Sequence, residues 1–154
     1  MVSMPSKHKS CWMVFALFLA LHEMNARAEQ PKLQCPVAIK TIELTYSHVG
    51  GQSKPQLGAI FANHAEKHVA AITFSLSQLD SAGSPHPYPD DLIYRGGLST
   101  GKQKHFTWDL SPEAVDLHRT GELLLVRAVR YDDATEWKDD GSESCSFTVD
   151  YHAR

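Results

Sequence analysis

The sequence predicts an all-β protein, a sandwich of about seven short strands that is exported after a signal peptide is removed. Three observations predict this. The N-terminal segment has the composition of a secretory signal. Most of the remaining chain alternates between apolar and polar residues with a period of two. The remainder also holds an isolated pair of cysteines near its two ends, at positions 35 and 145.

The predicted signal peptide covers residues 1–28. A basic stretch that contains Lys7 and Lys9 precedes the unbroken apolar run CWMVFALFLAL, and Ala26-Arg27-Ala28 supplies a small-x-small cleavage site. The run is shorter than the roughly 20 residues that a helix needs to cross a bilayer. We therefore expect residues 29–154 to form a single domain with no transmembrane segment, located in a periplasm or outside the cell.

Charge limits the classes of partner. The whole chain has a formal net charge of −3. Removal of the signal takes away Lys7, Lys9, Arg27 and Glu23, which leaves 12 basic and 17 acidic residues and a net charge of −5. Binding to nucleic acid or to anionic lipid requires a basic surface, so this balance argues against both.

The first half of the domain reads as three strands. Residues 37–46 alternate, with a bulge expected after Thr41. Residues 48–56 contain two adjacent glycines and a proline, and we predict a loop there. Two further strands are predicted at 57–63 and 69–79.

The second half of the domain contains four more predicted strands. The proline-rich residues 80–91 suit a loop or a sheet edge and not a central strand. Strands are predicted at 92–94 and at 102–110, the second with Phe106, Trp108 and Leu110 facing inward.

After these, Ser111-Pro112-Glu113 resembles a helix cap, and a single helical turn is predicted over 114–118. Residues 122–131 form the most hydrophobic segment and are expected at the centre of a sheet. The last strand is predicted at 146–151.

Seven short strands in an exported chain of this length indicate a β-sandwich of immunoglobulin or fibronectin III type. Cys35 and Cys145 would begin the first and last strands, which can lie side by side in such a sandwich. In an oxidising compartment this pair predicts a disulfide. A redox-active or metal-binding pair is the alternative, but the C-x-x-C spacing is absent.

Five short stretches resemble the FxLYD-type, immunoglobulin-like domains of bacterial exported proteins. They are residues 58–63, 72–76, 79–83, 100–102 and 106–108. They give a strand that ends in Asn, an F-x-L strand followed by an acidic residue and a glycine turn, and a Gly-Lys entry into a later strand. The resemblance spans residues 37–130, although Ser77 and Gln78 interrupt the motif and no Tyr precedes Asp80. It implies an extracytoplasmic sandwich without catalytic residues.

A pair of histidines, His64 and His68, marks the turn between two predicted strands. Their spacing of four residues is more typical of exposed turn residues, but it also suits a surface site for Zn²⁺ or Cu²⁺. The H-E-x-x-H motif is absent, because Glu66 does not directly follow His64.

The densest charge cluster is segment 132–143, DDATEWKDDGSE. We interpret it first as a solvated hairpin, with binding of Ca²⁺ by its oxygen ligands as the alternative. The candidate binding residues of this segment are Asp132, Asp133, Trp137, Asp139 and Asp140. Trp137 either folds back over the edge of the sandwich or stacks on a sugar ring.

The sequence thus predicts a non-catalytic exported domain that binds another envelope or extracellular protein, with edge strands and residues 83–91 as contact surfaces. The alternative is a carbohydrate- or metal-binding module that uses segment 132–143. The G-x-S-x-G motif of serine hydrolases is absent. We expect no catalytic residues and no cofactor.

Overall fold

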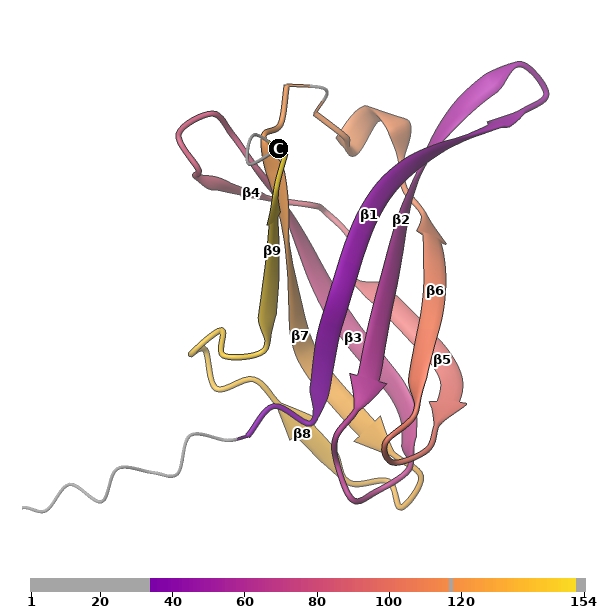
Figure 1. Ribbon diagram of the computed structural model, residues 1–154, viewed down its shortest axis with the longest axis vertical. Helices are drawn as coiled ribbons and strands as arrows, with labels where there is room; N and C mark the ends of the chain where they lie inside the picture. The colour runs from indigo at the N-terminus through magenta and orange to yellow at the C-terminus, as the bar shows by residue number, and fades with distance from the viewer. Residues whose placement is uncertain (1–33, 117, 152–154) are drawn as a thin grey trace, which may run out of the picture. The chain divides into compact units, whose positions relative to one another are not determined.

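Two antiparallel sheets pack face to face, which confirms the all-β sandwich that the sequence predicts (Figure 1). The computed structural model describes residues 34–116 and 118–151. All of them belong to one unit, residues 31–154. The predicted signal peptide, residues 1–28, lies outside the described residues.

Nine strands and one short 3₁₀ helix form within this described part. They are β1 (Val37–Val49), β2 (Gln52–Asn63), β3 (Val69–Leu79), β4 (Pro85–Pro87), β5 (Leu92–Leu98), β6 (Gln103–Asp109), η1 (Pro112–Ala114), β7 (Gly121–Tyr131), β8 (Glu136–Lys138) and β9 (Ser146–Asp150). Seven of the strands correspond to the seven predicted ones. The other two, β4 and β8, have only three residues each.

The smaller sheet has the order β1-β2-β6, and the larger sheet is built on β3 and β7. Strand β3 pairs with β7 on one side and with β4 and β5 on the other. Strand β7 pairs with β8 and β9 on its far side. The most hydrophobic segment is therefore central, as predicted, while β1 and β9 lie at sheet edges.

Alternation along the strands turns one face of each sheet toward a shared core. Its centre is an aromatic cluster in which the Phe61 ring lies 5.3 Å from Phe74, 5.1 Å from Tyr94 and 6.4 Å from Trp108, centroid to centroid. Aromatic pairs at such distances, of which Phe61–Tyr94 packs edge to face, add to the free energy gained from burial. Trp108 also donates from Nε1 to the carbonyl of Ile93 at 3.0 Å, so its one polar atom is paired.

The predicted loop at 48–56 is wrong, because β1 and β2 continue through it as one hairpin (Figure 1). Gly50 and Gly51 have φ angles of 61° and 78°, which suit a two-residue turn matched to strand twist. Pro55 lies within β2, where its carbonyl accepts from Leu110 on the β6 side. The N–H and C=O of one strand residue point sideways toward the same neighbouring strand, so the missing N–H of Pro55 removes no bond to β1.

Of two smaller predictions, one is confirmed and one is wrong. The bulge in β1 is confirmed, with the register shifting between Ile39 and Thr41. The helical turn expected at 114–118 is wrong: the turn is a 3₁₀ helix at Pro112–Ala114, and Val115 is extended with φ −100° and ψ 111°. Val115 is buried in the core, so packing of this apolar side chain overrides the local helical signal.

The predicted disulfide joins Cys35, just before β1, to Cys145, just before β9, with a Cα–Cα distance of 5.4 Å. Because β1 and β9 belong to different sheets, this bond links the two layers of the sandwich at one end.

The motif residues of the resemblance organise turns. Asn63 is fully buried, and its side chain donates to the carbonyls of Lys67 and Leu98 and accepts from the N–H of Ala65. Asp80 accepts from the N–H groups of Ala82 and Ser84. These contacts explain why the residue types are needed without assigning them a chemical role.

Candidate functional site

The histidine turn and the acidic segment predicted as separate sites lie against each other. Lys67 Nζ lies 2.7 Å from Asp133 Oδ2, and His68 Nδ1 lies 2.7 Å from Asp132 Oδ2. The N–H of Asp132 also donates to the carbonyl of His68 at 3.2 Å. The acidic turn is thus partly neutralised by the neighbouring turn, which the linear sequence does not reveal.

Asp133 is the most strongly perturbed carboxyl of this region. Hydrogen bonding to Lys67, and secondarily to Thr135, lowers the pKa of Asp133 from 3.8 to about 2. Both partners favour the charged form, so Asp133 remains a carboxylate at neutral pH and is engaged in holding its own turn.

The predicted metal site at His64 and His68 stays a prediction. Among residues 34–116 and 118–151, no group of three or more His, Cys, Asp or Glu side chains is placed to hold a metal ion. His64 joins its turn to the segment just before β1 through its N–H, which donates to the carbonyl of Pro36 at 2.8 Å.

Trp137 turns toward the sandwich. It lies in β8 opposite Val129, is half-buried and packs against the core. Together with Tyr131 and His64 it lines a hollow of about 350 Å³ beside Cys35. Its Nε1 is buried and has no hydrogen-bond partner within the described part of the chain. This geometry agrees with the prediction that Trp137 folds back over the edge of the sandwich, and part of its ring remains accessible in the hollow.

Asp139 and Asp140, the other two candidates in this segment, stabilise the turn that follows β8. Asp139 accepts from the N–H of Gly141 at 3.1 Å, and Asp140 accepts from the N–H of Ser142 at 2.9 Å. The five candidates of segment 132–143 therefore do not converge on one binding point.

A groove lies between the two edge strands β1 and β9. We call it the β1/β9 groove; it has a volume of about 620 Å³ and is lined by Thr41, Ile42, Glu43, Leu44, Phe147, Val149 and Tyr151. Leu44, Phe147 and Val149 are only partly buried against the core. Within the described residues β1 pairs only with β2 and β9 only with β7, so both strands keep an unpaired edge.

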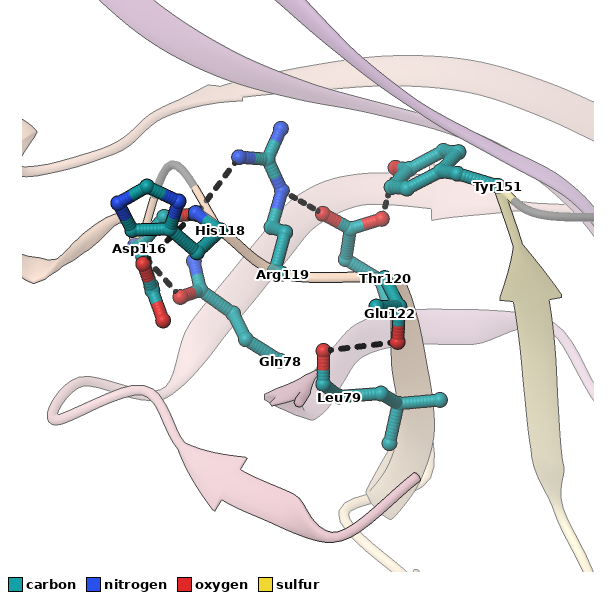
Figure 2. A network of polar contacts seen from close by, with 8 residues as sticks. All are labelled: Gln78, Leu79, Asp116, His118, Arg119, Thr120, Glu122 and Tyr151. Atoms are coloured by element: carbon teal, nitrogen blue, oxygen red, sulfur yellow. Dashed lines mark hydrogen bonds and ion pairs between the residues drawn. The ribbon is translucent and has the colours of Figure 1, made fainter. Parts of the chain in front are cut away.

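A buried ionic network supports one wall of this groove (Figure 2). The side chain of Glu122 is 1% exposed, and its Oε1 accepts from Arg119 Nε at 2.5 Å, while its Oε2 accepts from the hydroxyl of Tyr151. The Arg119 guanidinium also lies over the Tyr151 ring, 5.8 Å from its centroid. Tyr151 is thus held in place by a fully paired carboxylate.

The same network anchors the loop before β7. Arg119 donates from Nη1 to the carbonyl of Asp116, whose N–H donates to Gln78 Oε1, both at 2.8 Å. The hydroxyl of Thr120 donates to the carbonyl of Asp80 at 2.6 Å. The loop, the end of β3 and the end of β9 are therefore fixed to one another at this end of the sandwich (Figure 2).

Burial is the main influence on the titration of Glu122. Desolvation raises the pKa of Glu122 above its ordinary value of 4.5, and hydrogen bonding and attraction from Arg119 oppose that rise. The carboxyl depends on Arg119 to remain charged inside the protein.

Sequence reasoning missed both the groove and the network. A usable signal existed for Glu122, because it shares the inward face of β7 with Leu124 and Val126. A single acidic residue at an inward position indicates a buried carboxylate that needs a partner. No comparable signal exists for the groove, whose two walls come from opposite ends of the chain.

Comparisons with known proteins bear on the fold. No family model matches the chain, and no curated protein matches it. A solved structure of a hypothetical protein from Peptoclostridium difficile 630 is similar with a TM-score of 0.51 and 11% identity, over 76% of this chain and 95% of that chain. At this identity the similarity shows a shared fold alone.

Two further structures match more weakly. One is the Northeast Structural Genomics Consortium target SoR45, with a TM-score of 0.41 and 7% identity, over 75% of this chain and 86% of that chain. The other is a β-glucosidase involved in saponin metabolism from intestinal bacteria, with a TM-score of 0.35 and 12% identity, over 75% of this chain and 16% of that chain. Neither carries a functional argument. In the described part of the chain no helix is long and apolar enough to span a membrane.

Proposed function

We propose that this protein is a non-catalytic, exported β-sandwich that binds an extended segment of another envelope or extracellular protein in the β1/β9 groove. The observation that carries the proposal is the coincidence of two unpaired strand edges with a partly apolar groove of about 620 Å³. An unpaired edge offers backbone N–H and C=O groups to an added strand, and a groove beside it receives alternate side chains.

The proposed occupant is an extended peptide with apolar residues at every second position. Its backbone would pair with β1, and its inward side chains would lie between Leu44 on one wall and Phe147 and Val149 on the other. Two features support a prepared site. The disulfide fixes the two walls at one end, and the Glu122–Arg119–Tyr151 network fixes the β9 wall at the other.

The non-catalytic and exported parts of the proposal rest on separate support. The two most perturbed carboxyl groups described above are engaged in ion pairs with neighbouring cations, in Lys67–Asp133 and Arg119–Glu122. A disulfide that links the two sheets suits an oxidising compartment, in agreement with the predicted signal peptide. The resemblance to FxLYD-type domains is part of the same proposal.

Site-specific photo-crosslinking in the producing cells tests the proposal. A photoreactive amino acid would replace Leu44 or Val149 in the groove, and in a matched control it would replace Thr107, which is exposed on β6. We expect one protein to crosslink from both groove positions and not from Thr107, through a peptide with alternating apolar residues. Equal crosslinking from all three positions, or none from the groove, would contradict the proposal.

The alternative of a carbohydrate- or metal-binding module based on segment 132–143 is tested in parallel. A ligand that binds the folded state raises the melting temperature by mass action. Failure of Zn²⁺, Cu²⁺, Ca²⁺ and neutral sugars to raise the melting temperature would remove that alternative.

A further inference from the structure

The two strands that form the walls of the β1/β9 groove run in the same direction. The disulfide joins Cys35 and Cys145 just before β1 and β9, and both strands lead away from it (Figure 1). Neighbouring strands lie about 4.8 Å apart, so two strands with a third between them are roughly 10 Å apart. The Cα–Cα distance of 5.4 Å at the disulfide leaves no room for a third strand there. The groove lies further along, where its β1 wall begins at Thr41.

The backbone of β1 turns alternate residues toward the groove. The N–H of Leu110 donates to the carbonyl of Pro55, so the backbone groups of Pro55 face β6. Tyr46 lies opposite Pro55 in the β1–β2 register, and its N–H and C=O therefore point away from β2. The register continues without a shift back to Ile42, so Ile42 and Leu44 have the same orientation as Tyr46. These three residues present their backbone groups to the unpaired edge of β1.

The backbone of β9 alternates in the complementary way. The N–H of Tyr151 donates to the carbonyl of Thr120, and the carbonyl of Cys145 accepts from the N–H of Val126. Both ends of β9 therefore identify the odd-numbered residues as those that bond on the β7 side, and the register between the two strands has no shift. Thr148, in the middle of β9, turns its N–H and C=O toward the unpaired edge.

Side chains follow the same two patterns. On β1 the residues with groove-facing backbone also turn their side chains inward, where Ile42 is buried and Leu44 half-buried. On β9 the relation is reversed, because Thr148 is exposed while Phe147 and Val149 line the groove. In any strand the backbone groups alternate between the two sides and the side chains between the two faces. A strand placed in the groove therefore bonds to β1 through its inward residues and to β9 through its outward residues.

The direction of such a strand follows from its neighbours. Because β1 and β9 run the same way, a strand that is antiparallel to one is antiparallel to the other. All strand pairs within the described residues are antiparallel. Antiparallel pairing is also slightly more stable per residue than parallel pairing. An antiparallel strand places its inward residues directly opposite Ile42, Leu44 and Tyr46.

Tyr46 supplies an apolar surface for this strand to cover. It shares the inward face of Ile42 and Leu44, but it lies where β1 continues into the hairpin with β2, and 41% of its surface is exposed. An apolar residue opposite Tyr46 would remove part of that surface from water, which favours binding.

We propose that the partner segment binds as one strand inserted between β1 and β9, antiparallel to both, opposite residues 42–46 of β1. This inference rests on the proposed function and specifies the segment that the partner supplies. The first, third and fifth residues of the segment are apolar and bond to β1, while the second and fourth bond to β9. None of the five is proline, because every N–H faces a strand edge. Binding joins the two sheets along this side of the sandwich.

A segment added to the chain itself tests the proposal. Strand β9 ends remote from the disulfide, so a flexible Gly/Ser linker after Arg154 can return the segment Val-Thr-Val-Thr-Val into the groove antiparallel to β9 (Figure 1). Amide hydrogen exchange is measured by NMR, residue by residue, with and without this extension. We expect exchange to become at least about tenfold slower at four N–H groups, because each gains a partner. They belong to Ile42, Leu44 and Tyr46 on β1 and to Thr148 on β9.

Two matched extensions separate the contributions of the two edges. Proline at the second and fourth positions removes only the N–H groups that face β9, and proline at the third position removes the N–H that faces Leu44. Both extensions should lose most of the slowing, while Thr107 on β6 should exchange at the same rate in every form. Equal slowing with a proline extension, slowing on β1 without slowing at Thr148, or no slowing at all would each overturn the inserted strand.

The same measurement on a captured complex distinguishes this inference from the proposed function. A partner crosslinked from Leu44 whose complex leaves exchange at Thr148 unchanged would overturn the inserted strand and keep the proposed function. Capture of no partner from Leu44 or Val149 would overturn the proposed function, whichever extension enters the groove.

Discussion

The buried pair of Arg119 and Glu122 makes a sharp test of how the end of the sandwich is stabilised. Replacing Arg119 with Met removes the donor that lies 2.5 Å from the Glu122 carboxylate, and also the contact of 2.8 Å to the carbonyl of Asp116. The Arg119 side chain is only 11% exposed, so water replaces it poorly. Breaking a buried ion pair on one side typically costs about 3–5 kcal/mol.

Two features of the structure set the expected loss of stability in Arg119→Met and its dependence on pH. The hydroxyl of Tyr151 still donates to Glu122 in the variant, which favours the lower end of the range, about 3 kcal/mol at neutral pH. Burial already raises the pKa of Glu122 above 4.5, and loss of Arg119 raises it further. The native variant therefore binds a proton at a pH at which the unfolded chain does not, so its stability increases as pH falls toward 4.5.

Equilibrium unfolding in urea between about pH 7 and pH 5 measures this effect, with linear extrapolation to water. The deficit of Arg119→Met should shrink as pH falls. The double variant Arg119→Met/Glu122→Leu should recover most of the lost stability, since no buried charge is left unpaired. A deficit below about 1 kcal/mol at neutral pH, or one independent of pH, would refute the reasoning.

Three further predictions concern other parts of the fold. Replacing Cys35 and Cys145 with Ser removes a cross-link between residues that are 110 positions apart in the sequence. The chain-entropy estimate predicts that the free energy of unfolding, measured in urea, falls by about 4–5 kcal/mol, and a loss below about 1 kcal/mol would contradict it. Asp133→Asn should be less stable than the wild type at neutral pH, and thermal melts should show this difference disappearing as pH falls from 3.8 to about 2. The reason is that the contacts that lower the pKa of Asp133 stabilise only its charged form, which is protonated over this range. A difference in stability that stays constant with pH would argue against the Lys67 contact. In Gly121→Ala the added Cβ overlaps the carbonyl oxygen of Val149, so β9 must shift, at a cost of about 1–3 kcal/mol in urea unfolding; a neutral effect would show that β9 moves freely.

The fold was largely predictable from the sequence because strand alternation is a local signal. The inward faces of β3 and β7 each bury residues spaced by two, such as Phe74 and Leu76 on β3. The predicted disulfide followed from the number of cysteines and from the oxidising compartment that the sequence leads us to expect. These inferences need no knowledge of which strands are neighbours.

The errors arose where local signals have two meanings. Gly50, Gly51 and Pro55 are typical of a loop, yet here the two glycines form a tight turn, and Pro55 occupies a strand position where its missing N–H removes no bond to β1. The signal for a helical turn after Pro112 was overridden by burial of Val115. In both cases the outcome depends on partners that are distant in the sequence.

The candidate sites depended still more on tertiary structure. Segment 132–143 reads as an exposed acidic loop, but Lys67 and His68 from another turn pair with its first two residues. The β1/β9 groove combines side chains from strands far apart in the chain. Residue types along the sequence do not determine such neighbours.

The central claim is that a partner segment adds to β1 as a strand within the β1/β9 groove. Amide hydrogen exchange, measured on the protein alone and on the complex captured by crosslinking from Leu44, tests it most directly. The account predicts slower exchange at the β1 residues that line the groove, Thr41–Leu44, and little change in β6 of the same sheet. Unchanged exchange at Thr41–Leu44 in the complex, or equal slowing in β6, would contradict it.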